Sequence, residues 1–160
     1  MPTIQGVQAT VHYEQVSAGR TFVLRLEDGD IVHEVIERFA TEQKIRAASV
    51  IVVGGADGGS RLVVGPEQGR SDPILSRIHI LDDAHEVAGT GTLFPDEQGQ
   101  PLLHLHLAAG RGDRAVVGCA RVGVKTWHVL EVVLVELTGS QGVRRLDPAL
   151  GFKLLDPEGL

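Results

Sequence analysis

Cysteine is almost absent from this chain, and its scarcity limits how the fold can be held together. Cys119 is the only cysteine among the 160 residues, so no disulfide can form within the chain. A chain of this length can instead bury a hydrophobic core large enough for one domain. With no disulfide to maintain, a reducing compartment is the default, and we expect a cytoplasmic protein.

Long apolar runs are absent as well. No stretch reaches the roughly 18 consecutive apolar residues that a membrane-spanning helix needs. The first residues, MPTIQGVQATVHYEQV, lack the basic segment and the continuous apolar run of a signal peptide. We therefore expect no association with a membrane.

Aromatic residues and clustered positive charge are also scarce. Aromatic side chains make up 4% of the residues, and 15 lysines and arginines are scattered through a chain of formal net charge −6. A nucleic-acid interface gathers positive charge on one face and often stacks bases on aromatic rings. The composition therefore disfavours DNA as a partner.

Short strand-like segments dominate what is present. Alternating or apolar segments separated by Gly, Pro and Asp turns predict strands at 21–26, 47–55, 61–65, 74–81, 85–94, 101–108, 116–123 and 127–137. One stretch, 31–45, places its apolar residues at helical spacing instead. The pattern predicts an α+β fold, a mainly antiparallel β-sheet with one principal amphipathic helix.

Neither a linker nor an internal repeat divides the chain. We expect a single domain over residues 1–160, with a core of about 19–155. Residues 138–160 contain two Asp-Pro pairs and several glycines, and they predict an ordered tail or extended C-terminal arm.

The order of these segments resembles a known family. The segments GRTFVLRLEDGDIVHEVIERFATEQKIRAASV, VVGGADGGSRLVV, HEVAGTGTLF, PLLHLHLA, GCARVG and EVVLVEL follow one another as in the PPC domain (plants and prokaryotes conserved domain, DUF296). The resemblance covers roughly residues 19–155. It implies an antiparallel sheet flanked by short helices and assembly as a homotrimer.

Plant members of this family join the domain to AT-hook segments, which hold the minor groove of DNA. An AT-hook centres on Arg-Gly-Arg-Pro, whereas GRGDR at 110–114 carries an aspartate where the proline is needed. Together with the acidic balance, this departure predicts that DNA binding is absent at physiological salt.

The fold of the family is similar to that of alpha-acetolactate decarboxylase, a zinc enzyme with a His-x-His pair and a later third histidine. His104 and His106 match the pair. In prokaryotic relatives the segment matching GCARVG commonly reads Gly-His-Leu, so Cys119 stands where the third histidine would be. The resemblance implies either a zinc site with altered chemistry or a site that has decayed.

Strand geometry can bring these three side chains together. On a strand, His104 and His106 point to one face about 6.7 Å apart, while the neighbouring leucines face the other way. If the chain turns tightly at residues 112–113, Cys119 lies opposite His106 on the same face. Two imidazoles and one thiolate then leave a fourth zinc position open, as in catalytic zinc sites.

The same three residues have two other interpretations. In one, His104 and His106 hydrogen-bond across a trimer interface while Cys119 fills space in the core. In the other, Cys119 is a nucleophile with His106 as its base, but no third residue that would orient the base can be identified.

The other histidines are expected outside this site. We expect His79 and His85 at the surface or an interface, although His85 could reach the site from a neighbouring strand. His33 lies on the polar flank of the predicted helix and should be solvated. His128 should pack with Trp127.

Two further features have structural interpretations. Glu131 shares a strand face with Val129, Val133 and Val135, so we expect it to be buried in a structural ion pair, with Arg121 or a histidine as its partner. The alternative for Glu131 is a general base or a group that orients a metal ligand. Residues 54–60, GGADGGS, lack the Gly-Lys-Ser/Thr ending of a phosphate loop and are expected to form a turn between strands.

Three functions follow from these expectations. The first is a homotrimeric binding or assembly module with a zinc site at His104, His106 and Cys119, open to a small-molecule ligand. The second is a zinc-dependent lyase or hydrolase acting on a small carbonyl compound. The third is a DNA-associated regulator. The acidic charge disfavours the third, and no acid/base pair specifically supports the second.

Overall fold

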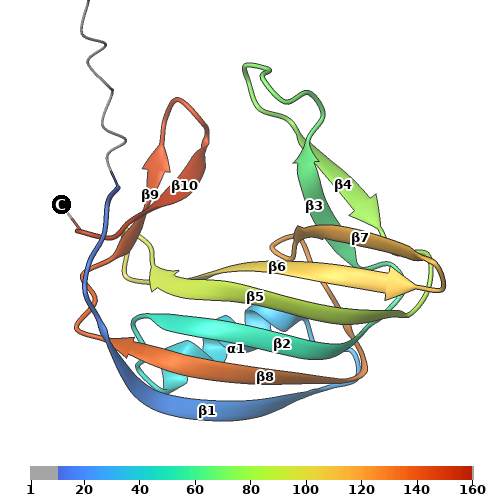
Figure 1. Cartoon of the computed structure of the whole chain (residues 1–160), viewed down its shortest axis with the longest axis horizontal. Coiled ribbons are helices and arrows are strands. Elements are labelled where there is room, and N and C mark those ends of the chain that lie inside the picture. The colour runs from blue at the N-terminus through green and yellow to red at the C-terminus, as the bar shows by residue number, and fades with distance from the viewer. Residues whose placement is uncertain (1–10, 160) are drawn as a thin grey trace, which may run out of the picture.

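Antiparallel strands make up most of the computed structural model, which describes residues 11–159 (Figure 1). The large sheet has the strand order β1-β8-β2-β5-β6-β7-β3-β4, with every neighbouring pair antiparallel. Its strands are β1 (Ser17–Glu27), β2 (Ala48–Ala56), β3 (Arg61–Pro66), β4 (Ser76–Ile80), β5 (His85–Pro95), β6 (Pro101–Arg111), β7 (Arg114–Cys119) and β8 (Thr126–Thr138). The predicted α+β, mainly antiparallel fold is confirmed.

The helix α1 (Val32–Glu42) is shorter than the predicted stretch of 31–45. Its core-facing residues Val32, Ile36 and Ala40 are fully buried, as the helical spacing predicted. The helix ends early because Lys44 adopts a left-handed backbone conformation, with φ of 55°. Within residues 11–159 the structure contains no second helix, so the short flanking helices implied by the resemblance are not found there.

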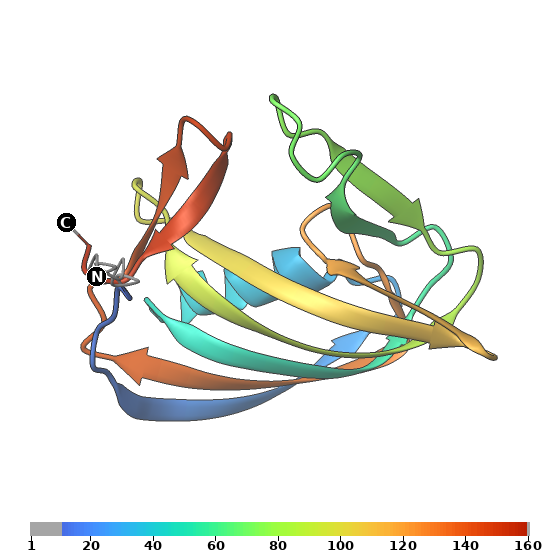
Figure 2. The ribbon, with the colours of Figure 1, turned by 45° about the horizontal axis from the view of Figure 1, so that its top comes forward.

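Strand β6 separates a core face from an outer face. Leu103, Leu105 and Leu107 are buried in one core cluster with the core-facing residues of α1. Figure 2 shows α1 lying along one face of the sheet. His104 and His106 point to the opposite side because successive side chains of a strand alternate. The alternation predicted from the sequence is therefore confirmed.

Two glycines of β5 fix how closely β5 and β6 approach. A β carbon added at Gly91 would overlap the carbonyl oxygen of His104, and one added at Gly89 would overlap that of His106. Only a residue without a β carbon fits there without moving the backbone. The backbone that carries both histidines is thus positioned by these glycines.

A hairpin of β9 (Val143–Asp147) and β10 (Phe152–Asp156) follows the large sheet. The sequence predicted an ordered tail or arm in this region but not these two strands. The hairpin rises from one end of the sheet, and the β3–β4 pair rises from the other end on the same side (Figures 1 and 2). The outer face of β5 and β6 therefore lies between two raised walls.

The outer face of β1, β8 and β2 carries a row of exposed apolar side chains. Val23 is 77% exposed and Ile51 is 56% exposed, and Val133 lies directly between them in the strand register. A contiguous exposed apolar patch on a sheet commonly marks an interaction surface.

Among the residues that the structure describes, no helix has the length and apolar character needed to cross a bilayer.

Candidate metal centre

The turn between β6 and β7 brings Cys119 to the histidines. Arg111 pairs with Arg114 across a two-residue turn in which Gly112 has φ of 61°. A residue without a β carbon adopts this conformation at no steric cost. The register that follows places Cys119 directly opposite His106, as the sequence predicted.

The three candidate ligands form one cluster. The Nε2 atoms of His104 and His106 lie 3.1 Å apart, a distance at which one ring donates a hydrogen bond to the other. The centroids of the two imidazole rings are 4.9 Å apart, and the ring planes are nearly perpendicular. With the Cys119 Sγ included, all three ligand atoms lie within 4.8 Å of one another.

This cluster fits a tetrahedral zinc ion. Two nitrogens bound at about 2.0–2.1 Å to one tetrahedral zinc lie about 3.3 Å apart, close to the 3.1 Å separation of the imidazole nitrogens. A bound nitrogen and thiolate sulfur lie about 3.6 Å apart, so the Cys119 Sγ needs to approach by roughly 1 Å at most. Imidazole and thiolate are also ligands that zinc prefers.

The electrostatic surroundings keep His104 neutral. Burial lowers the pKa of His104, and the nearby Arg144, His106 and Arg121 lower it further. A neutral imidazole has the free lone pair that a metal ligand needs. At neutral pH, His104 is therefore in the form that can bind a metal.

A cavity of about 470 Å³, which we call the inner cavity, opens onto the cluster. His104 and Cys119 line its floor, and Arg121, Arg144 and Lys153 bring three positive groups to it. The other residues that line it are apolar and come from β6 and β10, namely Leu102, Leu103, Phe152, Leu154 and Leu155. This volume and this mixture of apolar walls with a few polar groups are typical of a small-molecule site.

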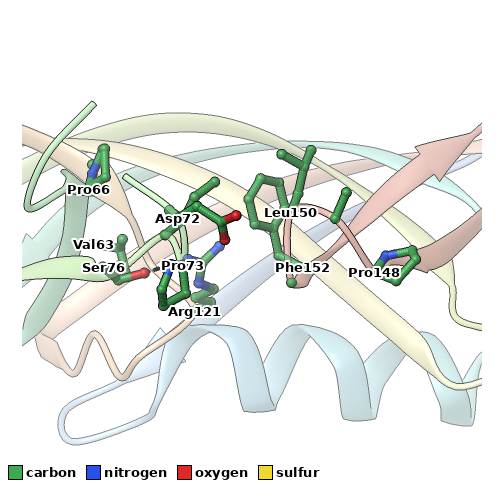
Figure 3. A pocket seen from close by; sticks show the side chains of 13 residues that line it. Val63, Pro66, Asp72, Pro73, Ser76, Arg121, Pro148, Leu150 and Phe152 are labelled. Carbon is green, nitrogen blue, oxygen red and sulfur yellow. Dashed lines mark hydrogen bonds between the residues drawn. The ribbon is translucent and has the colours of Figure 1, made fainter. Parts of the chain in front are cut away.

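A wider cavity of about 780 Å³ adjoins this one through Arg121 and Phe152. Figure 3 shows Asp72 and Ser76 on one side of it and Leu150 and Phe152 on the other. On the first side, Asp72 lies between β3 and β4 and Ser76 begins β4, and the second side belongs to the β9–β10 hairpin. The wider cavity therefore lies between the two raised walls of the sheet.

The remaining histidines lie outside the cluster. His79 is exposed on β4, and His85 contacts the Asp83 carbonyl oxygen at 2.8 Å through its Nδ1. His128 packs against Trp127 with the rings 4.6 Å apart, as expected. The expectation that His33 is solvated is wrong, because it is half-buried and its Nδ1 has no partner among the described residues.

The expectation that Glu131 is buried is also wrong. Glu131 does share a face with Val129 and Val133, but that face is the outer one, which α1 does not cover. No ion pair of Glu131 occurs within residues 11–159, and its cross-strand neighbours are Arg25 and Val53. Strand alternation shows which side chains share a face but not which face is covered.

The turn predicted over residues 54–60 is confirmed only for 57–60, which connect β2 to β3, because 54–56 belong to β2. The Asp57 carboxylate in this turn pairs with Lys125 at 2.7 Å. The sequence analysis missed Arg144, which is only 5% exposed and lines the inner cavity. The alternation in VRRLD at 143–147 is the signal that could have indicated a strand there, with one arginine facing inward.

Comparison with known sequences gives one family and one curated relative. The sequence profile of the Plants and Prokaryotes Conserved (PCC) domain matches residues 13–138. The chain is 32% identical over 135 residues to the bifunctional protein GlmU of Synechococcus sp. (strain JA-3-3Ab), over 83% of this chain and 20% of that protein. The chain thus spans about a fifth of that relative's length.

Solved structures share the fold. A metal-containing protein of Archaeoglobus fulgidus matches with a TM-score of 0.75 and 22% identity, over 91% of this chain and 98% of that one. A PPC protein of Pyrococcus horikoshii matches with a TM-score of 0.72 and 20% identity, over 88% and 94%. A candidate DNA-binding protein of Bacteroides thetaiotaomicron matches with a TM-score of 0.71 and 20% identity, over 91% and 99%. Given the profile match over most of its length, this chain belongs to the Plants and Prokaryotes Conserved domain family.

Proposed function

We propose that this chain is a zinc-binding module of the PPC type that assembles as a homotrimer in the cytoplasm. His104, His106 and Cys119 would hold the ion. The observation that carries this proposal is the cluster itself, in which two imidazole nitrogens and one thiol sulfur lie within 4.8 Å of one another. The metal-containing relative of A. fulgidus adds support through its shared fold.

Each residue of the cluster would contribute one ligand atom to the zinc ion. His104 and His106 would each give one imidazole nitrogen, and Cys119 would give a thiolate after losing its proton. When bound, zinc would supply a Lewis acid at the edge of the inner cavity, which His104 and Cys119 line. The chain's own contribution is to hold three ligands on rigid, paired strands and to shape the space above them.

The apolar outer face supports self-association. Val23, Ile51 and Val133 form a row across three strands, and all three are exposed in the single chain. Covering them would remove apolar surface from water, which contributes about 25 cal/mol per Å². Two further copies of this chain are the occupants that we propose for this face, in agreement with the trimer implied by the family resemblance.

A zinc-dependent lyase or hydrolase is the second candidate, and the inner cavity above the cluster favours it. However, no carboxylate lines that cavity among the residues that the structure describes, so this candidate lacks an evident general base. A DNA-associated role has less support, since the chain has a formal net charge of −6.

Metal content tests the proposal. The wild-type protein, purified without chelator and without a tag, should contain about one zinc per chain by mass spectrometry. His104→Ala/His106→Ala and Cys119→Ala should each lose it, whereas the control His79→Ala, which changes an exposed histidine outside the cluster, should keep it. Wild-type protein that stays free of zinc after zinc addition and desalting would refute the metal site.

A further inference from the structure

Two arginines at the inner cavity have no acidic partner. Within residues 11–159, neither Arg144 nor Arg121 forms an ion pair, whereas Lys153 at the same cavity pairs with Asp96 at 3.0 Å and Glu97 at 3.1 Å. Asp72 lines the adjoining cavity with Arg121 but makes no ion pair with it. Positive charge without an acidic partner is thus concentrated at the inner cavity, in a chain that is acidic overall.

Arg144 is the more unusual of the two. It is 95% buried, and its Nη2 donates to the Thr92 side-chain oxygen at 2.8 Å and to the Thr92 carbonyl oxygen at 3.4 Å. Its Nε is buried with no hydrogen-bond partner among the described residues. A guanidinium stays charged in proteins, and a buried charge needs a compensating partner.

Arg121 is exposed and faces the same space from the segment after β7. Its only side-chain hydrogen bond in the described part of the chain is a weak one of 3.5 Å to Ser76 Oγ. Beyond the two arginines, the cavity wall is built largely of leucines and Phe152. Two guanidinium groups without an acidic partner, beside an apolar wall, match a molecule that has one anionic end and one apolar end.

We propose that this cavity binds a small organic anion, with its carboxylate or phosphate held by Arg144 and Arg121 and its apolar body packed against β10. The planar guanidinium fork suits either anionic group. The inference deepens the proposed function, and it rests on the proposed zinc site only in placing the anion beside His104 and Cys119. A zinc ion held by two neutral imidazoles and one thiolate would keep one net positive charge, so the metal would not satisfy the arginines.

A competing explanation is that Arg144 serves only to compensate a Cys119 thiolate. That explanation gives Arg121 no role and predicts no affinity for anions. The two explanations therefore differ in a binding experiment.

Titration calorimetry on the full chain, both zinc-loaded and chelator-treated, tests the inference with three probes. Benzoate carries a carboxylate, phenyl phosphate carries a phosphate, and benzamide is a neutral molecule shaped like benzoate. We expect one of the two anions to bind at least about tenfold more tightly than benzamide, and the tighter one identifies the anionic group. That anion should also shift the Nε–H NMR signal of Arg144.

Variants locate the site. Arg144→Gln and Arg121→Gln should each weaken binding of the anion about tenfold or more, while Arg111→Gln, which removes a surface arginine elsewhere, should not. If Arg144→Gln fails to fold, the exposed Arg121 carries the test.

Three results would overturn the inference: no saturable binding of either anion, benzamide binding as tightly as the anions, or wild-type affinity in the folded arginine variants. Zinc binding without anion binding would refute this inference alone. Anion binding by a protein that takes up no zinc would refute only the proposed metal site.

Discussion

Glu37 links the helix to the strand that carries the histidines, and its removal is a sharp test of the structure. The half-buried Glu37 Oε1 accepts a hydrogen bond of 2.8 Å from the backbone N–H of Leu103, the residue before His104. Leu103 is itself buried, so water cannot easily replace the lost acceptor. Glu37→Ala should therefore lower the free energy of unfolding by about 1–3 kcal/mol.

Glu37→Gln is the matched control, since its amide oxygen can still accept from Leu103. Urea unfolding of the chelator-treated protein measures both variants. We expect Glu37→Gln to lose clearly less stability than Glu37→Ala. Equal stability of Glu37→Ala and wild type would refute the link between α1 and β6.

The pH dependence of the same comparison adds a second check. Burial raises the pKa of Glu37, the bond from Leu103 and the charge of His33 oppose that rise, and Glu34 adds to it. Because the folded state then binds the Glu37 proton more tightly than the unfolded state, protonated Glu37 contributes to the free energy of unfolding at low pH. The contribution is lost as pH rises through the folded pKa. Glu37→Gln should lack this component, and an unchanged pH profile would contradict the assignment.

Three further predictions concern the site and the outer face. Gly91→Ala should cost about 1–3 kcal/mol of stability and weaken zinc binding, because its β carbon meets the His104 carbonyl oxygen, whereas Gly110→Ala, whose nearest contact is at 3.9 Å, should be close to neutral. Burial and the nearby arginines lower the pKa of His104, so the metal-free protein should have its full stability above about pH 6.5 and lose stability as pH drops toward the folded pKa of His104. His104→Gln should flatten this pH dependence in urea unfolding. An unaltered pH dependence would count against the lowered pKa of His104. Ile51→Lys should shift the protein from trimer to monomer in sedimentation velocity, and a wild type that sediments as a monomer would remove the trimer from the proposal.

The core and the candidate cluster were accessible from the sequence because both depend on local periodicity. The alternation of leucine and histidine at 103–107 fixes the two faces of β6, and the short turn at 112–113 fixes the register to Cys119. The helix was recognisable from its apolar stripe, but its end was not, because it depends on the backbone conformation of Lys44.

The remaining features depend on long-range packing that a sequence pattern does not contain. Alternation in β8 correctly placed Glu131 on the same face as its valine neighbours. Which of the two faces α1 covers depends on the packing of the whole sheet. The β9–β10 hairpin has short strands with mixed charge, so its periodicity is weak. Its position over β5 and β6, which brings Arg144 to the cavity, appears only in three dimensions.

X-ray absorption at the zinc K-edge tests the central claim most directly, because it counts the atoms around the metal. For the zinc-loaded wild type we predict two imidazole nitrogens at about 2.0–2.1 Å and one sulfur at about 2.3 Å, with the sulfur lost in Cys119→Ser. A wild-type spectrum without a sulfur neighbour would remove Cys119 from the site. A spectrum without imidazole scattering would contradict the assignment of His104 and His106.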